Sequence, residues 1–172
     1  MTEQFMQRAI AIARESLDAP GTLPYGAVVV KDGKIIGEGL NRSLLLCDPT
    51  SHGEMEAIRD ACRRLGSVDL VGCELYTSSE PCSMCVATSY ITGITKLYYG
   101  SSVADSMAFF SKLAERDPKW ARRFSPLDVR RDVGLPVDQR VMPSQQLLKN
   151  DANDVFESFA LRIGSDRPDH KN

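Results

Sequence analysis

Four residues of this 172-residue chain have the types and the spacing of a metal-dependent hydrolytic site. His52 stands in S-H-G-E, while Cys82 and Cys85 stand in P-C-S-M-C, so two segments together supply one imidazole and two thiols. Zinc binds imidazole nitrogen and thiolate sulfur, and a catalytic zinc typically keeps three protein ligands and one water. Glu54 follows the histidine by two residues, and its carboxylate could move protons for that water. The set therefore predicts a catalytic zinc site.

The C-x-x-C pair has two other interpretations. A redox pair would need a thioredoxin-like context and would have no use for His52 or Glu54. A structural zinc takes four protein ligands, and no fourth ligand is evident, because His170 lies in the polar tail and the other cysteines lack paired spacing. Glu54 also has a second interpretation, since Ser51 and Glu54 fit the S-x-x-E capping box at the start of a helix.

Turn residues and apolar periodicity predict the elements that position these side chains. The predicted order is a helix over 3–18, a hairpin over 26–40 around Asp32-Gly33, a helix from Ser51 to about Leu65, a strand over 72–78, a helix from Pro81 to Gly93, and a strand over 94–100. Alternating strands and helices indicate an α/β fold, a three-layer α/β/α sandwich with a mixed central sheet. The metal ligands then fall at the N-termini of two helices that pack side by side on one face of the sheet.

The rest of the chain is less regular. We predict a helix over 103–116, a long surface excursion over 117–143 with a short strand near 137–141, and a final helix capped by Ser144. Phe156 lies on that final helix among acidic residues, where it could stack on a flat base or simply pack in the core. We expect one domain over 1–163 and a disordered polar tail over 164–172.

The composition excludes several classes of protein. With 42% hydrophobic and 26% charged residues and a net charge of −2, the chain is typical of a globular protein and has no basic field for binding structured nucleic acid. No apolar run reaches the length of a membrane span. The five cysteines are an odd number, and no export signal precedes them, which argues against a disulfide framework and favours a cytoplasmic location.

H-x-E followed by P-C-x-x-C is also the signature of zinc deaminases that act on nucleobases. The chain resembles the cytidine-deaminase superfamily from residue 3 to about 105, in the branch of guanine or guanosine, cytosine and tRNA-adenosine deaminases. C-E-L-Y-T-S-S-E-P-C is most similar to bacterial guanine deaminases and plant guanosine deaminases, whereas H-G-E is similar to fungal cytosine deaminase. The G-F-D-D-like segment of guanine deaminases is absent, and A-F-F-S-K stands nearby.

The resemblance implies a homodimeric Zn²⁺ enzyme that hydrolytically deaminates a small amino-heterocycle, guanine-like first and cytosine-like second, and releases ammonia. It implies that Glu54 carries protons from the water to the ring and the leaving amine, and that Asn41 hydrogen-bonds the ring or its sugar. Groups around Ser79 and Glu80 would line the other side of the substrate, and Phe156 is a further candidate contact. Two alternatives remain, a tRNA adenosine deaminase, which would need a basic surface, and a non-catalytic zinc module, which would not need Glu54.

Overall fold

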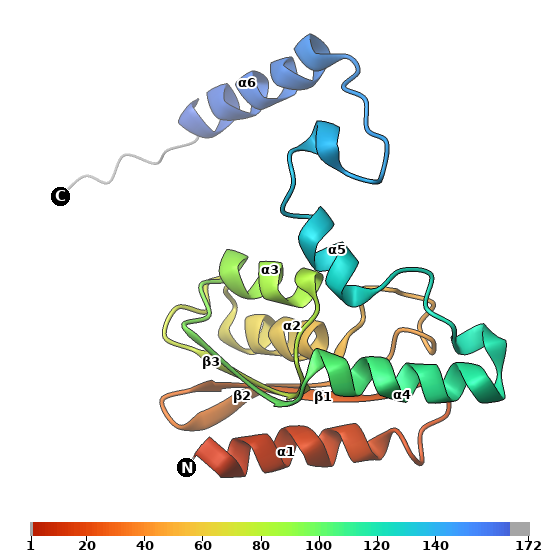
Figure 1. The fold of residues 1–172 in the computed structure, drawn as a ribbon. Coiled ribbons are helices and arrows are strands. Elements are labelled where there is room, and N and C mark those ends of the chain that lie inside the picture. Colours follow the sequence, from red (N-terminus) through yellow and green to blue (C-terminus); the bar gives the residue numbers. More distant parts are fainter. Residues whose placement is uncertain (1, 166–172) are drawn as a thin grey trace. The chain divides into compact units, whose positions relative to one another are not determined.

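A four-stranded mixed sheet forms the middle of the computed structural model, which describes residues 2–165 (Figure 1). The strands are β1 (Leu23–Lys31), β2 (Lys34–Asn41), β3 (Glu74–Ser79) and β4 (Lys96–Ser101). Their order is β2-β1-β3-β4, with β1 antiparallel to β2 and β3, and β3 parallel to β4. Asp32 and Gly33 join β1 to β2 with φ values of 49° and 72°, as a tight two-residue hairpin requires. The predicted hairpin and mixed sheet are confirmed.

Helices cover both faces of this sheet. Helix α1 (Thr2–Glu15) lies on one face, while α2 (Gly53–Leu65) and α3 (Ser83–Ile91) lie on the other, as Figure 1 shows. All of residues 26–30 in β1 are buried, because alternate side chains point to opposite faces and both faces are covered. The structure therefore confirms the three-layer α/β/α sandwich, with the boundaries of the elements shifted by a few residues.

Two glycines of β2 bring α2 unusually close to the sheet. A Cβ atom built on Gly37 would lie 2.3 Å from the carbonyl oxygen of Ala57, and one built on Gly39 would lie 2.2 Å from the carbonyl oxygen of Gly53. Real Cβ contacts are never so short, so the backbone of α2 rests where side chains would otherwise stand. The first turn of α2, next to His52, is thus held against the hairpin by direct backbone contact.

Helix α4 (Val103–Arg116) follows β4, which confirms the helix predicted over residues 103–116, and it begins with a capping box made by Ser102 and Asp105. The segment after it was predicted as an irregular excursion, but it contains the short helices η1 (Pro118–Trp120) and α5 (Pro126–Asp132). Pro126 stands in the first turn of α5 after the cap residue Ser125, so this proline starts a helix.

Two expectations for the later part of the chain are wrong. Residues 137–141 form no strand, because η2 (Val137–Gln139) takes up the first three of them and no described strand lies beside them. Ser144 does not cap the last helix, since α6 (Lys149–Ser165) begins five residues later and the Ser144 hydroxyl donates to the carbonyl of Met142.

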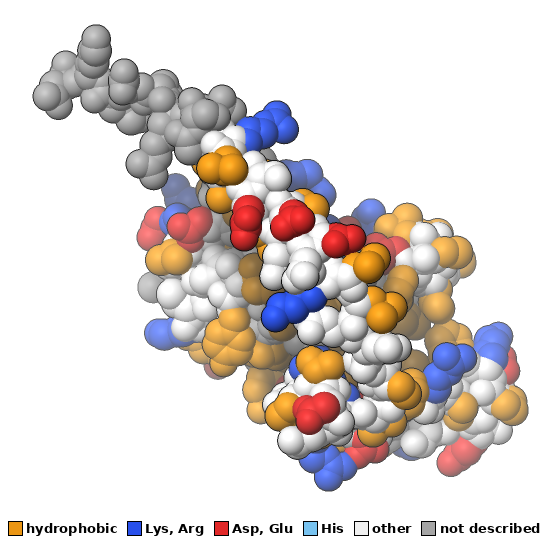
Figure 2. All heavy atoms as spheres, turned by 90° about the horizontal axis from the view of Figure 1, so that it is seen from above, with side chains coloured by type: hydrophobic (Ala, Val, Ile, Leu, Met, Phe, Trp, Pro, Cys, Tyr) orange, Lys and Arg blue, Asp and Glu red, His pale blue; other side chains and the backbone are white. Residues whose placement is uncertain are grey.

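The chain divides into two compact units, Met1–Val133 and Gly134–Asn172. The first contains the sheet and α1 to α5, and the second contains η2 and α6. Figure 2 shows apolar and acidic side chains next to each other along the helix that leads to the grey residues. The predicted polar tail lies outside the described residues from 166 onward, and one domain over 1–163 stays a prediction. Within the described part of the chain, no helix is long and apolar enough to cross a membrane.

Candidate active site

The predicted metal ligands converge between the N-termini of α2 and α3. His52 is the N-cap residue of α2, Cys82 is the N-cap residue of α3, and Cys85 lies in the first turn of α3. Each of the two sulfur atoms lies 3.6 Å from Nδ1 of His52, and the sulfurs lie 3.6 Å from each other. Helix α3 begins two residues later than predicted, so Pro81 precedes it. The spacing of Cys82 and Cys85 still puts both sulfur atoms on the side of α3 that faces His52.

The three donor atoms have the separations that a tetrahedral zinc ion requires. Zinc–nitrogen bonds of about 2.0–2.1 Å and zinc–sulfur bonds of about 2.3 Å at tetrahedral angles put nitrogen about 3.6 Å from sulfur, and the two sulfurs about 3.8 Å apart. The distances of 3.6 Å for all three pairs agree with this arrangement. Within the described residues, this is the one cluster of histidine, cysteine and acidic side chains that could hold a metal ion.

The protonation of the cluster also suits a cation. The hydrogen bond with Cys85 lowers the pKa of Cys82 to about 4, so Cys82 is a thiolate at neutral pH. The same hydrogen bond, together with burial, raises the pKa of Cys85. A hydrogen bond with Cys82 raises the pKa of His52. A divalent cation at the cluster would displace the protons that these groups hold, because zinc binds the deprotonated forms of cysteine and histidine.

Glu54 is almost fully buried beside this cluster, with an exposed fraction of 5%. Burial is the main cause that raises the pKa of its carboxyl group, and the charge of His52 opposes the rise. The capping-box interpretation is wrong, because α2 starts one residue later than that motif requires and His52 takes the cap position. The Ser51 hydroxyl instead donates to the carboxylate of Glu56, 3.1 Å away.

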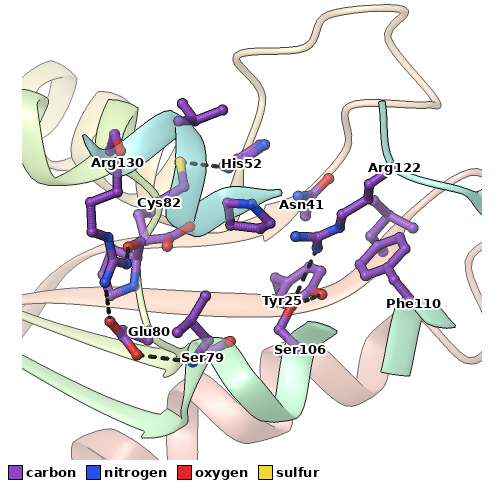
Figure 3. Close-up of a pocket in the computed structure, with 17 residues that line it drawn as sticks. Tyr25, Asn41, His52, Ser79, Glu80, Cys82, Ser106, Phe110, Arg122 and Arg130 are labelled. Atoms are coloured by element: carbon purple, nitrogen blue, oxygen red, sulfur yellow. Dashed lines mark hydrogen bonds and ion pairs between the residues drawn. The ribbon is translucent and has the colours of Figure 1, made fainter. Parts of the chain in front are cut away.

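A cavity of about 350 Å³ opens onto the cluster, as Figure 3 shows. Asn41, Ser79 and Glu80, which the sequence predicts as substrate contacts, all line this cavity together with His52 and Glu54. Phe156, the fourth predicted contact, lies on α6 in the second unit with an exposed fraction of 73%. Its contact with substrate stays a prediction.

Asn41 is held in one orientation at the end of β2. It is only 2% exposed, and its side-chain oxygen accepts hydrogen bonds from the backbone N–H and the hydroxyl of Ser43, at 3.1 and 2.8 Å. A backbone N–H can only donate, so the atom that faces it must be the amide oxygen. The amide NH₂ group of Asn41 therefore remains to donate to a molecule in the cavity.

Glu80 has both carboxylate oxygens engaged within the protein. One accepts a hydrogen bond of 2.7 Å from Arg130 on α5, and the other accepts a hydrogen bond of 2.9 Å from the backbone N–H of Val103 on α4. These contacts lower the pKa of Glu80. The guanidinium of Arg130 also donates to the carbonyl of Pro81, 3.2 Å away. Glu80 thus links the segment before α3 to the helices that close the cavity.

The remaining lining comes from residues that sequence reasoning missed. The Tyr25 hydroxyl lies 2.9 Å from the Ser106 hydroxyl, which also accepts a hydrogen bond of 3.3 Å from Arg122. The Arg122 guanidinium lies 3.9 Å from the ring centre of Phe110. One signal could have found part of this group, because Ser106 and Phe110 stand four residues apart on one face of the predicted helix 103–116. We call residues 103–133, which carry most of this lining, the cavity wall.

Comparison with known proteins places this geometry in a family. Residues 1–101 match the family model described as the cytidine and deoxycytidylate deaminase zinc-binding region. The chain belongs to this family. The match confirms the predicted resemblance, and the likeness to the relatives described below confirms the predicted enzyme class, a zinc-dependent aminohydrolase with the fold of this superfamily.

Two relatives and one solved structure show how far the likeness of this deaminase extends. Guanine deaminase from Bacillus subtilis is 34% identical over 157 residues, which are 91% of this chain and 92% of the relative. The solved structure of guanine deaminase from that organism has a TM-score of 0.78 at 31% identity and covers 99% of this chain and 97% of its own. The tRNA-specific adenosine deaminase of Aquifex aeolicus is 41% identical over 99 residues, 58% of this chain and 65% of the relative.

Proposed function

We propose that this deaminase hydrolyses the exocyclic amine of a free guanine-like base, with one zinc ion held by His52, Cys82 and Cys85. The observation that carries the proposal is the extent of the likeness to guanine deaminase, which spans 91% of the chain and therefore includes the cavity wall. The likeness to the tRNA-specific adenosine deaminase of Aquifex aeolicus covers 58% of the chain. The stretch that is similar to the guanine enzyme thus includes the cavity wall as well as the metal-binding residues.

Glu54 would carry the protons of the reaction. A zinc ion bound at the cluster would lower the pKa of a water ligand to about 7. Glu54 would accept one proton from the attacking water and deliver it to a ring nitrogen of the base, as the water oxygen bonds to the amine-bearing carbon. Glu54 then passes the second water proton to the amine, the C–N bond breaks, and ammonia leaves behind a ring carbonyl. Burial raises the pKa of Glu54 toward the range that suits a group that both accepts and donates protons.

Asn41 would orient the base through its free NH₂ group. Because Ser43 occupies the amide oxygen, the side chain presents donors and no acceptor to the cavity, which suits a ring nitrogen or carbonyl. Ser79, at the end of β3, lines the same cavity. Glu80 acts indirectly, because its carboxylate is engaged by Arg130 and by the backbone of α4.

Deamination of tRNA adenosine is the second candidate, and the 41% identity to the Aquifex aeolicus enzyme is what favours it. The net charge of −2 argues against it, because contacts between basic side chains and phosphates supply most of the affinity for nucleic acid. A cytosine-type base is the remaining alternative among small substrates.

An ammonia-release assay at equal substrate concentrations tests the proposal. We would compare guanine, guanosine, cytosine, adenine and a tRNA anticodon stem-loop, with the Glu54→Gln protein as the blank for each. Guanine should give the highest kcat/KM. Faster ammonia release from the stem-loop would assign tRNA adenosine as the substrate in place of guanine. A zinc-loaded protein that releases no ammonia from any of these substrates would contradict the proposed deaminase activity.

We also propose a cytoplasmic homodimer. Five free cysteines suit a reducing compartment, and Tyr90 and Ile91 at the end of α3 are 81% and 84% exposed, which is unusual for such large apolar side chains. Sedimentation equilibrium should give twice the chain mass. A monomer at working concentrations would contradict the dimer.

A further inference from the structure

Arg122 brings a positive charge to the cavity that the chemistry described above does not use. Its side chain lines the cavity, and Figure 3 shows the guanidinium pointing inward on the side away from Cys82 and Glu80. None of the ion pairs among the described residues includes Arg122. The other arginine of the lining, Arg130, is instead paired with Glu80 at 2.7 Å.

Neighbouring side chains fix the plane of this guanidinium. It lies 3.9 Å from the ring centre of Phe110, whose own ring centre lies 6.4 Å from that of Trp120. One of its nitrogens donates to the Ser106 hydroxyl, 3.3 Å away, and that hydroxyl lies 2.9 Å from the hydroxyl of Tyr25. A guanidinium has five N–H donors, so one hydrogen bond to the protein leaves several donors for a ligand. The neighbouring side chains thus hold the N–H donors of Arg122 in one plane, where they can donate to acceptors on a ligand in the cavity.

Guanine has such acceptors on the edge opposite its amine. Its exocyclic amine is on one edge of the purine, whereas O6 and N7 lie together on the far edge, where an arginine can donate to both at once. A base whose amine approaches Glu54 and the metal cluster would turn this far edge away from them. In the cavity, the side away from Cys82 is where Arg122 stands (Figure 3).

We propose that Arg122 determines specificity by donating hydrogen bonds to O6 and N7 of the base. The inference rests on the proposed guanine-like function and adds to it a residue that favours 6-oxopurines over bases with a donor or no group at that position.

The test is the preference of each protein among three substrates that share the 2-amine. The substrates are guanine, 7-deazaguanine, which lacks the N7 acceptor, and 2-aminopurine, which lacks O6. The wild type should favour guanine over each analogue by about ten- to a hundredfold in kcat/KM, the discrimination typical of a bidentate arginine. Arg122→Met should lose most of this preference by reacting more slowly with guanine, with little change toward the analogues.

Two further variants separate recognition from a structural effect. Arg122→Lys keeps the charge but cannot span both acceptors, so it should give an intermediate preference. Arg123→Met removes an exposed neighbouring arginine that does not line the cavity, and it should keep the wild-type preference. Zinc content and a melting curve check the fold of each protein, and Arg122→Lys decides the matter if Arg122→Met is unfolded.

Two outcomes would overturn the inference in different ways. A wild type that releases ammonia from guanine, with Arg122 variants that keep its preference among the three substrates, would overturn the role of Arg122 and leave the proposed function intact. A wild type that releases no ammonia from guanine would overturn both.

Discussion

The metal-binding half of the chain, residues 1–101, differs from the cavity wall, residues 103–133, in how its structure is held. In residues 1–101, which match the family model, the sheet is buried between helices. The candidate metal ligands of this half lie at the starts of α2 and α3. The wall has no fully buried residue in α4 or α5, and it is held by hydrogen bonds to distant residues. The difference teaches that the candidate metal ligands are held by packed elements, whereas the far side of the cavity is held by hydrogen bonds between distant residues.

The largest expected effect is on metal binding. Cys82→Ser removes one of three ligands and the thiolate of lowest pKa, so the purified protein should lose most of its zinc and with it its turnover. Cys47→Ser changes an exposed cysteine outside the cluster and is the matched control. Elemental analysis of both proteins measures the effect. Full zinc occupancy in the Cys82 variant would rule out the proposed ligand set.

Glu54→Gln should abolish chemistry without disturbing the metal. The amide cannot carry a proton between water and base, so kcat should fall by about two to four orders of magnitude while zinc content and the melting temperature stay close to wild type. Steady-state kinetics and a melting curve on the same preparation measure both. Wild-type turnover in this variant would leave Glu54 with no role in the reaction.

Arg130→Met tests whether the wall acts on substrate binding alone. The Arg130–Glu80 pair is partly exposed, with 39% of the arginine side chain accessible, so its loss should cost at most about 1 kcal/mol. We expect a KM increase of up to about fivefold with kcat and zinc content unchanged, and no change in Arg131→Met, whose side chain does not line the cavity. A fall in zinc content would show that wall and metal site are not independent.

The smallest expected effect lies far from the cavity, at the contact between α1 and β2. Arg8 donates to both oxygens of Glu38, at 2.8 and 2.7 Å, which lowers the pKa of Glu38. A lowered folded-state pKa stabilises the protein above the unfolded pKa of about 4.3, and this stabilisation is lost as the pH falls through the folded pKa.

Glu38→Gln should therefore reduce stability by less than about 1 kcal/mol at pH 7, since the pair is partly exposed and screened. The difference from wild type should shrink in urea unfolding at pH 3.5, and turnover at pH 7 should be unchanged. An equal difference at both pH values would attribute the effect to packing rather than to charge.

The sequence predicts the metal-binding half well because its signals are local. Asp32-Gly33 determines the hairpin, Gly66 closes α2 with a φ of 63°, and the two cysteines stand three residues apart at the start of one helix. The wall depends on contacts between distant residues, since Tyr25 meets Ser106 across 81 positions. Apolar periodicity carries no information on such pairs.

Two of the wrong predictions have the same cause. The strand expected near 137–141 had a suitable pattern but has no neighbouring strand within the described residues, and a strand needs a partner for its backbone hydrogen bonds. Ser144 is a suitable cap residue by type, but its hydroxyl donates to the carbonyl of Met142, and α6 begins five residues later. In both cases the residue types suit the predicted structure, but the hydrogen-bonding partner that the structure needs is not in place within the described residues.

The absence of a side chain at Gly39 has a consequence for the position of His52. A methyl group there would meet the carbonyl oxygen of Gly53 at 2.2 Å and the backbone nitrogen of Ala57 at 2.3 Å, so the first turn of α2 would have to move outward. His52 immediately precedes that turn and would move with it, away from sulfur atoms that belong to another helix. The position of the candidate zinc ligand His52 thus depends on the absence of a side chain at Gly39, on a strand that supplies none of the three ligands.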